Sequence, residues 1–505
     1  MNYFVDSDLG SAITGVEQAE FNRLTLFHRA GMPATIVYLT YKPRMQEFAK
    51  KFGVQGHSFT MYDYFQNATE YKDVEHYDWR NYWEKVCHYK LESIRGAYDL
   101  RIMDDDRFIM YASFLDGEYT RIKYINYFDK DHHKIRRDTY DCRGFLSRTT
   151  LLEEDDLTNT EIYYDPQQNV RLIKEYLVDH NKKKTYLRQV TIKGYNHREY
   201  YFASEEELRT FFFDQLFTQD DLVFVDRQSE MTRSIQNTNR NVKMIMIFHN
   251  THVVAGDDVR IGRLKFGVYD YALAHTDRAS AFVTATKQQK IDLKARYDNL
   301  PPIYTIPVSW ATPLAITDQE FKDRNPHRII SIARYSRQKQ LHHQVEAVER
   351  LVGEFPDIEL HLLGYGETVG AELQKYITDH HLEQHVFLRG FQLDLTDDLR
   401  QGSLALQTSI EEGFSIASLE ALSAGIPIIG YDINYGPKEM IVDGKNGFLI
   451  PANDKEMLYQ KMRQYLGNKD LQLKMMRNCQ PLVQKFSSTR MMEQWQQLVQ
   501  DMRKS

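Results

Sequence analysis

The chain has 505 residues, enough for about three domains, and 42% of its residues are hydrophobic, as in a globular protein. Its 64 Lys and Arg face 71 Asp and Glu, and the net charge of −7 argues against a nucleic-acid-binding protein. Cys87, Cys142 and Cys479 lie far apart without metal-ligand spacing, so we expect a reducing, cytoplasmic compartment and no zinc site. We find neither the pattern of a signal peptide nor an apolar run of about 18 residues.

Residues 1–66 carry the alternation of strands and helices that is typical of an α/β domain. We expect a strand at 3–5, a polar loop at 6–15, a helix at 16–30 and a second strand at 35–39. The order of strand, glycine-containing loop and helix recurs in sites where backbone N–H groups and a helix N-terminus face an anion.

Residues 67–203 have a different sequence pattern, without the alternation of strands and helices. Short runs rich in aromatic and β-branched residues, such as RFIMYASF and TRIKYINYF, are separated by turn-like segments such as DKDHH and DPQQN. This succession predicts an antiparallel meander of several strands. Because it interrupts the α/β alternation, we expect an inserted β domain.

The α/β alternation returns at Ser204, which with Glu207 predicts a capping box ahead of a helix. Strands that alternate with helices imply a parallel sheet. The expected strands are 222–226, 243–250, 281–286 and 303–310. Residues 1–66 and 204–317 are therefore predicted to form one Rossmann-like domain.

A second α/β series is expected within 318–488, and the polar stretch 318–326 at its start is predicted to link the two domains. Its short apolar strands again predict a doubly wound sheet. These strands are 328–334, 358–364, 385–390, 403–409 and 426–432. A final helix at 489–505 is of the kind that packs back across a first domain.

Two acids eight residues apart, Glu412 and Glu420, are predicted to lie on one face of a helix. Gly413 permits a close backbone approach just before that helix, whose N-terminus favours a diphosphate. Glu420 is then placed to hold a ribose, and Glu412 to hold hydroxyls of a transferred sugar. The alternative is an ordinary amphipathic helix with exposed acids. Gly413, together with the segment AGIP at 424–427 that leads from the helix into the next strand, favours the sugar-nucleotide site.

Arg334 and Lys339 follow the first strand of the second domain, at the sheet edge where ligands bind in open α/β folds. Two fixed cations at this place neutralise a pyrophosphate and the charge that grows on it as a sugar leaves. The alternative is a basic surface loop. Lys438, which follows Gly436-Pro437, is a further candidate for the donor site or a solvated loop lysine.

His249 and His252 follow an apolar strand, so both are expected at its carboxyl end, facing the cleft. A histidine at this place can donate to a sugar hydroxyl or to developing charge, although a lone histidine is more often structural. Metal binding by this pair needs a third ligand, and the nearby sequence supplies none.

The order of these motifs resembles glycosyltransferase family 4, whose members are retaining enzymes of the two-Rossmann-domain GT-B type. The matching motifs are Arg334-x4-Lys339, Gly364-x-Gly366, Glu412-x7-Glu420 and Gly436-Pro437. Three further features indicate which branch of the family the chain resembles: the segment TGVE at 14–17, the segment HNTH at 249–252 and the β insertion. They resemble the wall teichoic acid α-glycosyltransferases, including the poly(glycerol-phosphate) enzymes, and the related accessory-secretion enzymes that add N-acetylglucosamine to serine-rich adhesins.

The resemblance implies a cleft between the two Rossmann-like domains and a role for each matching residue. Arg334 and Lys339 hold the UDP diphosphate, Gly15 faces it, and His249 lies near the anomeric carbon. The family often has glycine where this chain has Ser415, which puts the identity of the sugar in doubt. The implied catalytic residues are His249, Arg334, Lys339 and Glu412, and the implied donor-binding residues are Gly15, Arg334, Lys339, Glu412, Gly413, Phe414, Ser415, Leu419 and Glu420. No metal or other cofactor is expected.

Two basic clusters in the insertion are candidates for binding a polyanionic acceptor through several weak contacts. The alternative is charged turns and edge-strand lysines that oppose aggregation. The candidate residues are Lys134, Arg136, Arg137, Lys182, Lys183, Lys184 and Arg188. In relatives the insertion also supports oligomerisation, so a homo-oligomer such as a trimer is expected.

The function that follows is transfer of glucose or N-acetylglucosamine from a UDP-sugar to hydroxyls of a wall teichoic acid polymer, with retention. UDP-glucose or UDP-N-acetylglucosamine and the polymer are the expected partners, at a peripheral position on the inner face of the membrane. One alternative acceptor is Ser or Thr of serine-rich adhesins. The other alternative, a non-catalytic companion subunit, is disfavoured because the cation pair and the acid pair are both present.

Overall fold

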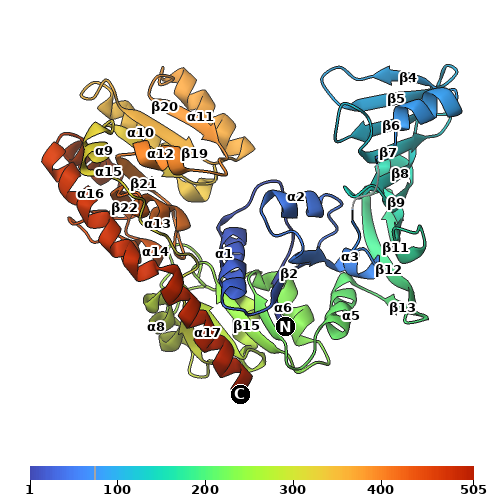
Figure 1. Ribbon diagram of the computed structural model, residues 1–505, viewed down its shortest axis with the longest axis horizontal. Helices are drawn as coiled ribbons and strands as arrows, with labels where there is room; N and C mark the ends of the chain where they lie inside the picture. The colour runs from blue at the N-terminus through green and yellow to red at the C-terminus, as the bar shows by residue number, and fades with distance from the viewer. Residues whose placement is uncertain (73–75, 505) are drawn as a thin grey trace.

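The computed structural model describes residues 1–72 and 76–504, and in that part three sheets form three lobes (Figure 1). Two sheets are parallel and lie in the lobes at the bottom and upper left of Figure 1. The third is antiparallel and forms the lobe at the upper right. This is the predicted pair of α/β sheets with an antiparallel insertion.

The first parallel sheet has the order β17-β16-β15-β14-β1-β2-β3. Its central strands are buried on both faces, and their apolar side chains leave few polar positions, as in other parallel sheets covered by helices. The strands are β1 (Asn2–Asp6), β2 (Ala34–Tyr38), β3 (Ser58–Thr60), β14 (Leu222–Val225), β15 (Lys243–Phe248), β16 (Ala281–Thr284) and β17 (Ile303–Thr305). The helices are α1 (Gly15–Arg29), α2 (Met45–Lys51), α3 (Met61–Phe65), α5 (Glu205–Leu216), α6 (Gln228–Gln236), α7 (Asp270–Ala274), α8 (Lys287–Arg296) and the 3-10 turn η3 (Thr276–Arg278).

The insertion is a ten-stranded meander in which each strand pairs with the next along the chain. Its far end has a small core of its own around Trp83, while its near end shares the core of the first lobe through Leu172 and Val190. The strands are β4 (Lys90–Ser93), β5 (Asp99–Asp104), β6 (Arg107–Phe114), β7 (Ile122–Phe128), β8 (Lys134–Tyr140), β9 (Leu146–Leu152), β10 (Thr158–Tyr164), β11 (Val170–Asp179), β12 (Lys184–Tyr195) and β13 (Arg198–Phe202). Three short helical segments accompany them: α4 (Trp79–Asn81), η1 (Tyr82–Val86) and η2 (Glu154–Asp156).

The second parallel sheet has the order β20-β19-β18-β21-β22-β23, in which the chain reverses direction across the sheet between β18 and β21. Ligands bind outside the carboxyl ends of the strands at such a switch point. The strands are β18 (Arg328–Ile332), β19 (Glu359–Leu363), β20 (Val386–Gly390), β21 (Leu404–Gln407), β22 (Ile428–Tyr431) and β23 (Gly447–Ile450). The helical segments are α9 (Asp318–Asp323), η4 (Arg337–Lys339), α10 (Leu341–Leu351), α11 (Glu367–Asp379), α12 (Thr396–Gln401), α13 (Ile416–Ser423), α14 (Gly436–Met440), α15 (Lys455–Leu466), α16 (Lys469–Val483), η5 (Gln484–Phe486) and α17 (Ser488–Lys504).

The stretch predicted as a polar linker contains helix α9. Thr317 accepts from the backbone N–H of Glu320, and the Glu320 carboxylate accepts from the backbone N–H of Thr317 at 2.8 Å, a complete capping box. The signal was therefore present in the sequence as Thr317 followed three residues later by Glu320.

Helix α17 leaves the second lobe and packs on the first sheet, as the red helix in Figure 1 shows. The Trp495 ring lies 5.9 Å from both Phe27 and Phe224, measured between ring centroids. The two parallel sheets are thus joined by a helix as well as by the chain that precedes α9. Within 1–72 and 76–504, we find no helix long and apolar enough to cross a membrane.

Candidate functional site

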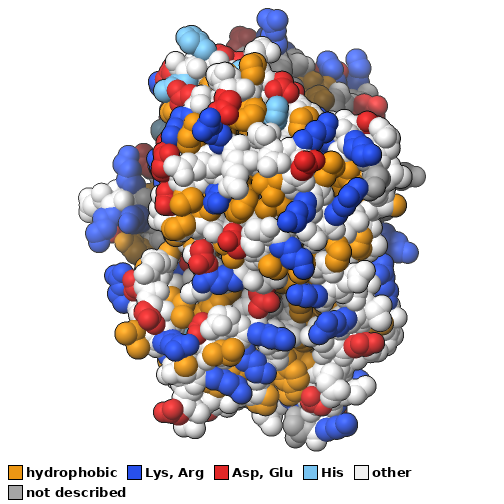
Figure 2. Space-filling view, turned by 90° about the vertical axis from the view of Figure 1, so that its left-hand side faces the viewer, with side chains coloured by type: hydrophobic (Ala, Val, Ile, Leu, Met, Phe, Trp, Pro, Cys, Tyr) orange, Lys and Arg blue, Asp and Glu red, His pale blue; other side chains and the backbone are white. Residues whose placement is uncertain are grey.

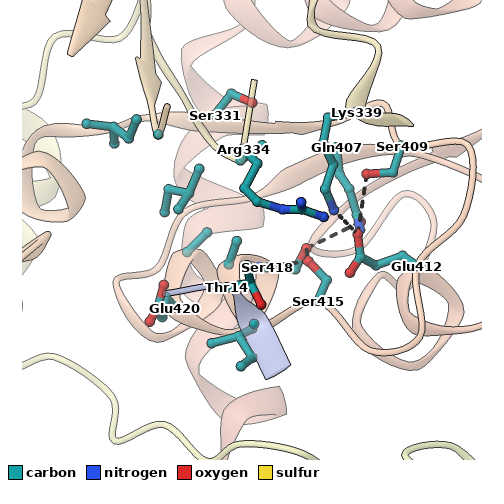
Figure 3. A pocket seen from close by; sticks show the side chains of 18 of the residues that line it. Thr14, Ser331, Arg334, Lys339, Gln407, Ser409, Glu412, Ser415, Ser418 and Glu420 are labelled. Atoms are coloured by element: carbon teal, nitrogen blue, oxygen red, sulfur yellow. Dashed lines mark hydrogen bonds and ion pairs between the residues drawn. The ribbon is translucent and has the colours of Figure 1, made fainter. Parts of the chain in front are cut away.

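A cavity of about 370 Å³ lies between the two α/β lobes. The first lobe contributes the start of α1 and the end of β15. The second lobe contributes the carboxyl ends of β18 and β21 and the start of α13. The lining includes Thr14, Gly15, His249, Arg334, Lys339, Glu412, Ser415 and Glu420. Figure 3 shows several of these side chains converging from both lobes.

The first lobe presents the N-terminus of α1 to this cavity. Thr14 caps the helix, and the Glu17 carboxylate accepts from the Thr14 backbone N–H at 2.7 Å. Arg227 forms an ion pair with Glu17 and another, at 2.7 Å, with the buried Asp6, and these charges hold the capping loop in place. The cavity therefore meets the positive end of a 15-residue helix at Gly15.

The second lobe presents the N-terminus of α13 to the same cavity. Ser415 has a φ of 77°, a conformation that favours glycine, and its hydroxyl accepts from the Ser418 backbone N–H at 3.2 Å. Because of this left-handed residue, α13 begins only at Ile416. The expectation that Glu412 and Glu420 share one helix face was therefore wrong, since Glu412 lies in the loop before the helix.

Arg334 is a solvent-exposed cation that points into the cavity. Among the residues described, its guanidinium has no ion-pair or hydrogen-bond partner, and Figure 3 shows it directed toward Lys339, Glu412 and Ser415. Its loop is held closely against the next strand's loop, because a Cβ on Gly364 would lie 1.9 Å from the Ala333 carbonyl oxygen. An unpaired, positioned arginine is suited to binding a phosphate.

Lys339 and Glu412 form an ion pair at one end of the cavity, with 2.5 Å between Nζ and Oε2. Ser409 also lies 3.4 Å from Glu412. Both charged side chains are about one-fifth exposed, so ligand atoms can reach them. A diphosphate that bound Lys339 would compete with Glu412 for this cation and would release the carboxylate for sugar hydroxyls.

Glu420 lies at the other end of the cavity in Figure 3, with Arg334 between it and the Lys339–Glu412 pair. Burial of the carboxyl group raises the pKa of Glu420 to about 7. In the described part of the chain nothing donates a hydrogen bond to this carboxylate. A half-buried acceptor without a partner is suited to a ligand that brings two hydroxyl donors.

His249 reaches the cavity from the end of β15, and Asp226 holds its ring through Nε2 at 2.6 Å. Burial alone would raise the pKa of Asp226, but the Arg23 guanidinium and the His249 hydrogen bond lower it to about 2. Arg23 is itself buried over the Phe4 ring. The orientation of the His249 ring is thus fixed by the buried Arg23–Asp226 ion pair.

His252 does not face the cleft, contrary to the expectation from the sequence. It is fully buried, and its Nε2 lies 2.8 Å from the carbonyl oxygen of Val259. The chain turns away from the strand direction at Asn250, whose side chain accepts from the Thr251 backbone N–H. The two histidines therefore separate, and only His249 reaches the cavity.

The two lobes touch beside this histidine. An added Cβ on Gly413 would lie 2.0 Å from the His249 carbonyl oxygen, so glycine allows the backbones to meet. Glu411 accepts from Asn250 and Lys265 of the first lobe and from Gln338 of the second, at 3.3, 2.5 and 3.1 Å. The sequence predicted no role of its own for Glu411, Asp226 or Thr14, although Thr14 begins the TGVE segment, in which Thr14 and Glu17 have the spacing of a capping box.

Some predicted residues do not line the cavity. Leu419 is fully buried in the core beneath α13, and Gly413 lies at the contact between the lobes. Lys438 forms an ion pair with Asp432 at 3.0 Å outside the cavity. Phe414 lines it while being almost wholly buried.

The seven basic residues proposed for the acceptor lie in the antiparallel lobe, five on its strands and Lys182 and Lys183 in the turn between β11 and β12, away from the cavity lining. Five of them bind neighbouring polar side chains. These contacts are Lys134–Asp156, Arg136–Asp138, Arg137–Asn126, Lys182–Asp179 and Lys183–Asp155. Lys184 and Arg188 are exposed and have no such partner among the described residues. The seven residues remain a prediction for acceptor binding.

In residues 1–72 and 76–504 we find no group of three or more His, Cys, Asp or Glu side chains arranged to hold a metal ion. The positive groups at the cavity are instead Arg334, Lys339 and the N-termini of α1 and α13.

The sequence of the second α/β lobe matches a known protein family. Residues 315–480 match the family model described as glycosyl transferases group 1. These residues include both cations and both acids of the cavity. The chain is therefore a glycosyltransferase.

Comparison with individual proteins indicates which glycosyltransferases this chain resembles. The chain is 24% identical over 463 residues to the UDP-N-acetylglucosamine–peptide N-acetylglucosaminyltransferase GtfA subunit of Streptococcus agalactiae, covering 89% of this chain and 87% of the relative. It is 23% identical to the poly(ribitol-phosphate) alpha-N-acetylglucosaminyltransferase of Staphylococcus aureus, covering 95% and 96%. The crystal structure of the pneumococcal O-GlcNAc transferase GtfA with UDP and GlcNAc is similar with a TM-score of 0.84, at 21% identity and coverage of 99% and 98%. This likeness confirms the predicted fold of two Rossmann-like lobes with an inserted antiparallel sheet.

Proposed function

We propose that the chain transfers N-acetylglucosamine or glucose from a UDP-sugar to hydroxyls of a wall teichoic acid polymer, with retention at the anomeric carbon. The observation that carries the proposal is the order of groups along the cavity. Three features follow one another between two helix N-termini: an acid for the ribose and an arginine for the diphosphate, neither with a partner among the described residues, and the Lys339–Glu412 pair, whose lysine meets the diphosphate and whose acid meets the sugar. Similarity to the poly(ribitol-phosphate) enzyme supports the polymer as acceptor.

The proposed chemistry needs only groups that the cavity and the substrates supply. The bond between the anomeric carbon and the diphosphate oxygen breaks, and the new charge on UDP meets Arg334, Lys339 and the two helix N-termini. The acceptor oxygen forms a bond to the anomeric carbon on the same face. Its proton passes to the departing phosphate oxygen, so the products are UDP and an α-glycoside.

A second acceptor is favoured by the likeness to the pneumococcal GtfA structure, namely Ser or Thr of a serine-rich adhesin. The test is incubation of the purified chain with UDP-N-acetylglucosamine or UDP-glucose and, separately, teichoic acid or an unglycosylated serine-rich protein. Transfer to the polymer, detected by labelled sugar in the polymer fraction, is the expected result. Transfer to the protein alone would replace the first acceptor by the second, and a lack of UDP release in every mixture would contradict both.

Binding of the UDP-sugar is expected to strengthen as the pH rises from about 6 to about 8, by several-fold. Below its pKa of about 7 Glu420 is protonated, and a carboxylic acid accepts two ribose hydroxyls less well than a carboxylate does. Binding therefore lowers this pKa and releases a proton. Calorimetry in buffers of different ionisation enthalpy measures the release, and a UDP-sugar suits it because its diphosphate does not titrate in this range.

The control for this measurement is Glu420→Gln, which keeps the shape of the side chain but cannot titrate. Its affinity is expected to be lower than that of the unaltered protein at pH 8 and nearly independent of pH. If the unaltered protein showed the same flat profile as the variant, Glu420 would not be the group that receives the ribose.

A further inference from the structure

Helices α16 and α17, with the turn η5 between them, form a strongly basic surface on a chain that is acidic overall. Residues 469–504 hold seven Lys and Arg against three Asp and Glu, whereas the whole chain carries −7. Figure 2 shows the side of the molecule on which α16 lies. On the lower part of the face shown in Figure 2, Lys and Arg side chains are spread with apolar side chains between them.

The cations on these two helices point outward because the helices bury their other face. Met475, Met476 and Cys479 are buried against the second lobe, while Lys474 and Lys485 project outward with exposed residues on the turns between them. On α17, Trp495 packs on the first lobe and Arg490 is exposed. The charges therefore follow from the amphipathic pattern of both helices.

A neighbouring helix and a neighbouring loop extend this surface. Helix α9 packs against α16 and carries the exposed Lys322, and Asn478 of α16 donates to the Lys445 carbonyl oxygen at 3.2 Å. Val442, beside Lys445, is an exposed apolar residue. We call this surface the basic face, and it consists of Lys322, Lys445, Lys469, Lys474, Lys485, Arg490 and Arg503.

The side chains of the basic face differ from most other cations of the chain in lacking partners. In the described residues none of the seven has a side-chain hydrogen bond or an ion pair. By contrast, Arg350, Lys455 and Arg463 on the adjoining helices bind Glu456, Glu346 and Glu354. Unpaired like charges held on one rigid surface repel one another, and an anionic partner would relieve that repulsion.

The basic face lies apart from the cavity. None of its residues lines the cavity, and α13, which does, packs between the cavity and α16. A polymer entering the cavity as acceptor would therefore not need to cross this surface. A diffuse array of cations with apolar side chains between them, and without a pocket, matches an anionic lipid surface better than a single phosphate group.

We propose that the basic face docks the enzyme on the surface of a bilayer that contains anionic phospholipid. The attachment is peripheral and electrostatic, and it leaves the cavity between the lobes away from the lipid contact. Binding is therefore expected to depend on the anionic lipid and to weaken as the salt concentration rises.

The test is sedimentation of the full chain with vesicles of phosphatidylcholine, with and without phosphatidylglycerol. The variant Lys474→Glu/Lys485→Glu/Arg490→Glu is expected to lower the fraction bound to phosphatidylglycerol vesicles by at least about tenfold, because each Lys or Arg near such a surface contributes to binding. Its thermal midpoint and its UDP-sugar hydrolysis are expected to stay unchanged, since all three residues are exposed and lie outside the cavity.

The matched control is Lys85→Glu/Arg95→Glu/Lys130→Glu, which changes the net charge equally at exposed positions on the antiparallel lobe. It is expected to bind vesicles much more strongly than the basic-face variant. Equal loss in both variants would show that net charge alone acts and would overturn the proposal. So would unchanged binding of the basic-face variant, or binding of the unaltered protein to soluble poly(glycerol phosphate) through this face without binding to vesicles.

Discussion

Replacing Lys339 by alanine is expected to lower kcat for sugar transfer by about 10³-fold, as loss of a donor to a developing oxyanion does in other enzymes. The Nζ of Lys339 lies at the end of the cavity where Glu412 is, and the guanidinium of Arg334 points toward it (Figure 3). It is placed to meet the charge that grows on the diphosphate. Single-turnover transfer from a UDP-sugar, with calorimetric binding of UDP, separates the loss of rate from the loss of affinity.

Arg337→Ala is the matched control for that variant. Arg337 is in the same short helical turn η4, but its side chain is largely exposed and pairs with Glu372 outside the cavity. We expect its kcat to stay within about twofold of the unaltered value, as for surface substitutions away from a site. If Lys339→Ala behaved like Arg337→Ala, the diphosphate would not lie between the two lobes in the way proposed.

Replacing Gly413 by alanine is expected to lower kcat/KM by about 10²-fold with little change in stability, because a misplacement of about 1 Å in a site has that effect. The new methyl group would lie 2.0 Å from the His249 carbonyl oxygen of the opposite lobe. The two backbones can move apart slightly to relieve this contact, because each lobe keeps a large core of its own. The cations of one lobe would then no longer face α1 and His249 of the other.

Steady-state kinetics and thermal unfolding together test this prediction. The thermal midpoint is expected to move by less than about 2 °C, which corresponds to an effect below about 1 kcal/mol. Gly353→Ala is the control, since an added methyl group there meets no atom within 4 Å. Full activity of Gly413→Ala would mean that contact between the lobes is not needed for transfer, and a large fall in its midpoint would mean that the contact mainly stabilises the fold.

The predicted fold depended on patterns that are local in the chain. Apolar runs such as the one that contains Ile329 and Ile330 in β18 predicted buried parallel strands. The short aromatic runs of 67–203 predicted an antiparallel meander. Element boundaries and short helices departed from the prediction: residues 318–326, predicted to be a linker, contain α9, and α13 begins after Glu412 instead of containing it. A left-handed residue such as Ser415 is difficult to predict because its conformation depends on the surrounding packing.

By itself, the sequence determined the chemical inventory of this glycosyltransferase: two cations, two acids, a histidine and glycines, in a motif order that indicates a sugar-nucleotide site. Only the tertiary structure decided which of them meet. Lys339 pairs with Glu412 across 73 residues, Asp226 holds His249, and Glu411 joins the lobes through Lys265. The physical reason is that such contacts depend on how segments far apart in the chain, and in the last case the two lobes, pack together, and residue spacing along the chain carries no record of that packing.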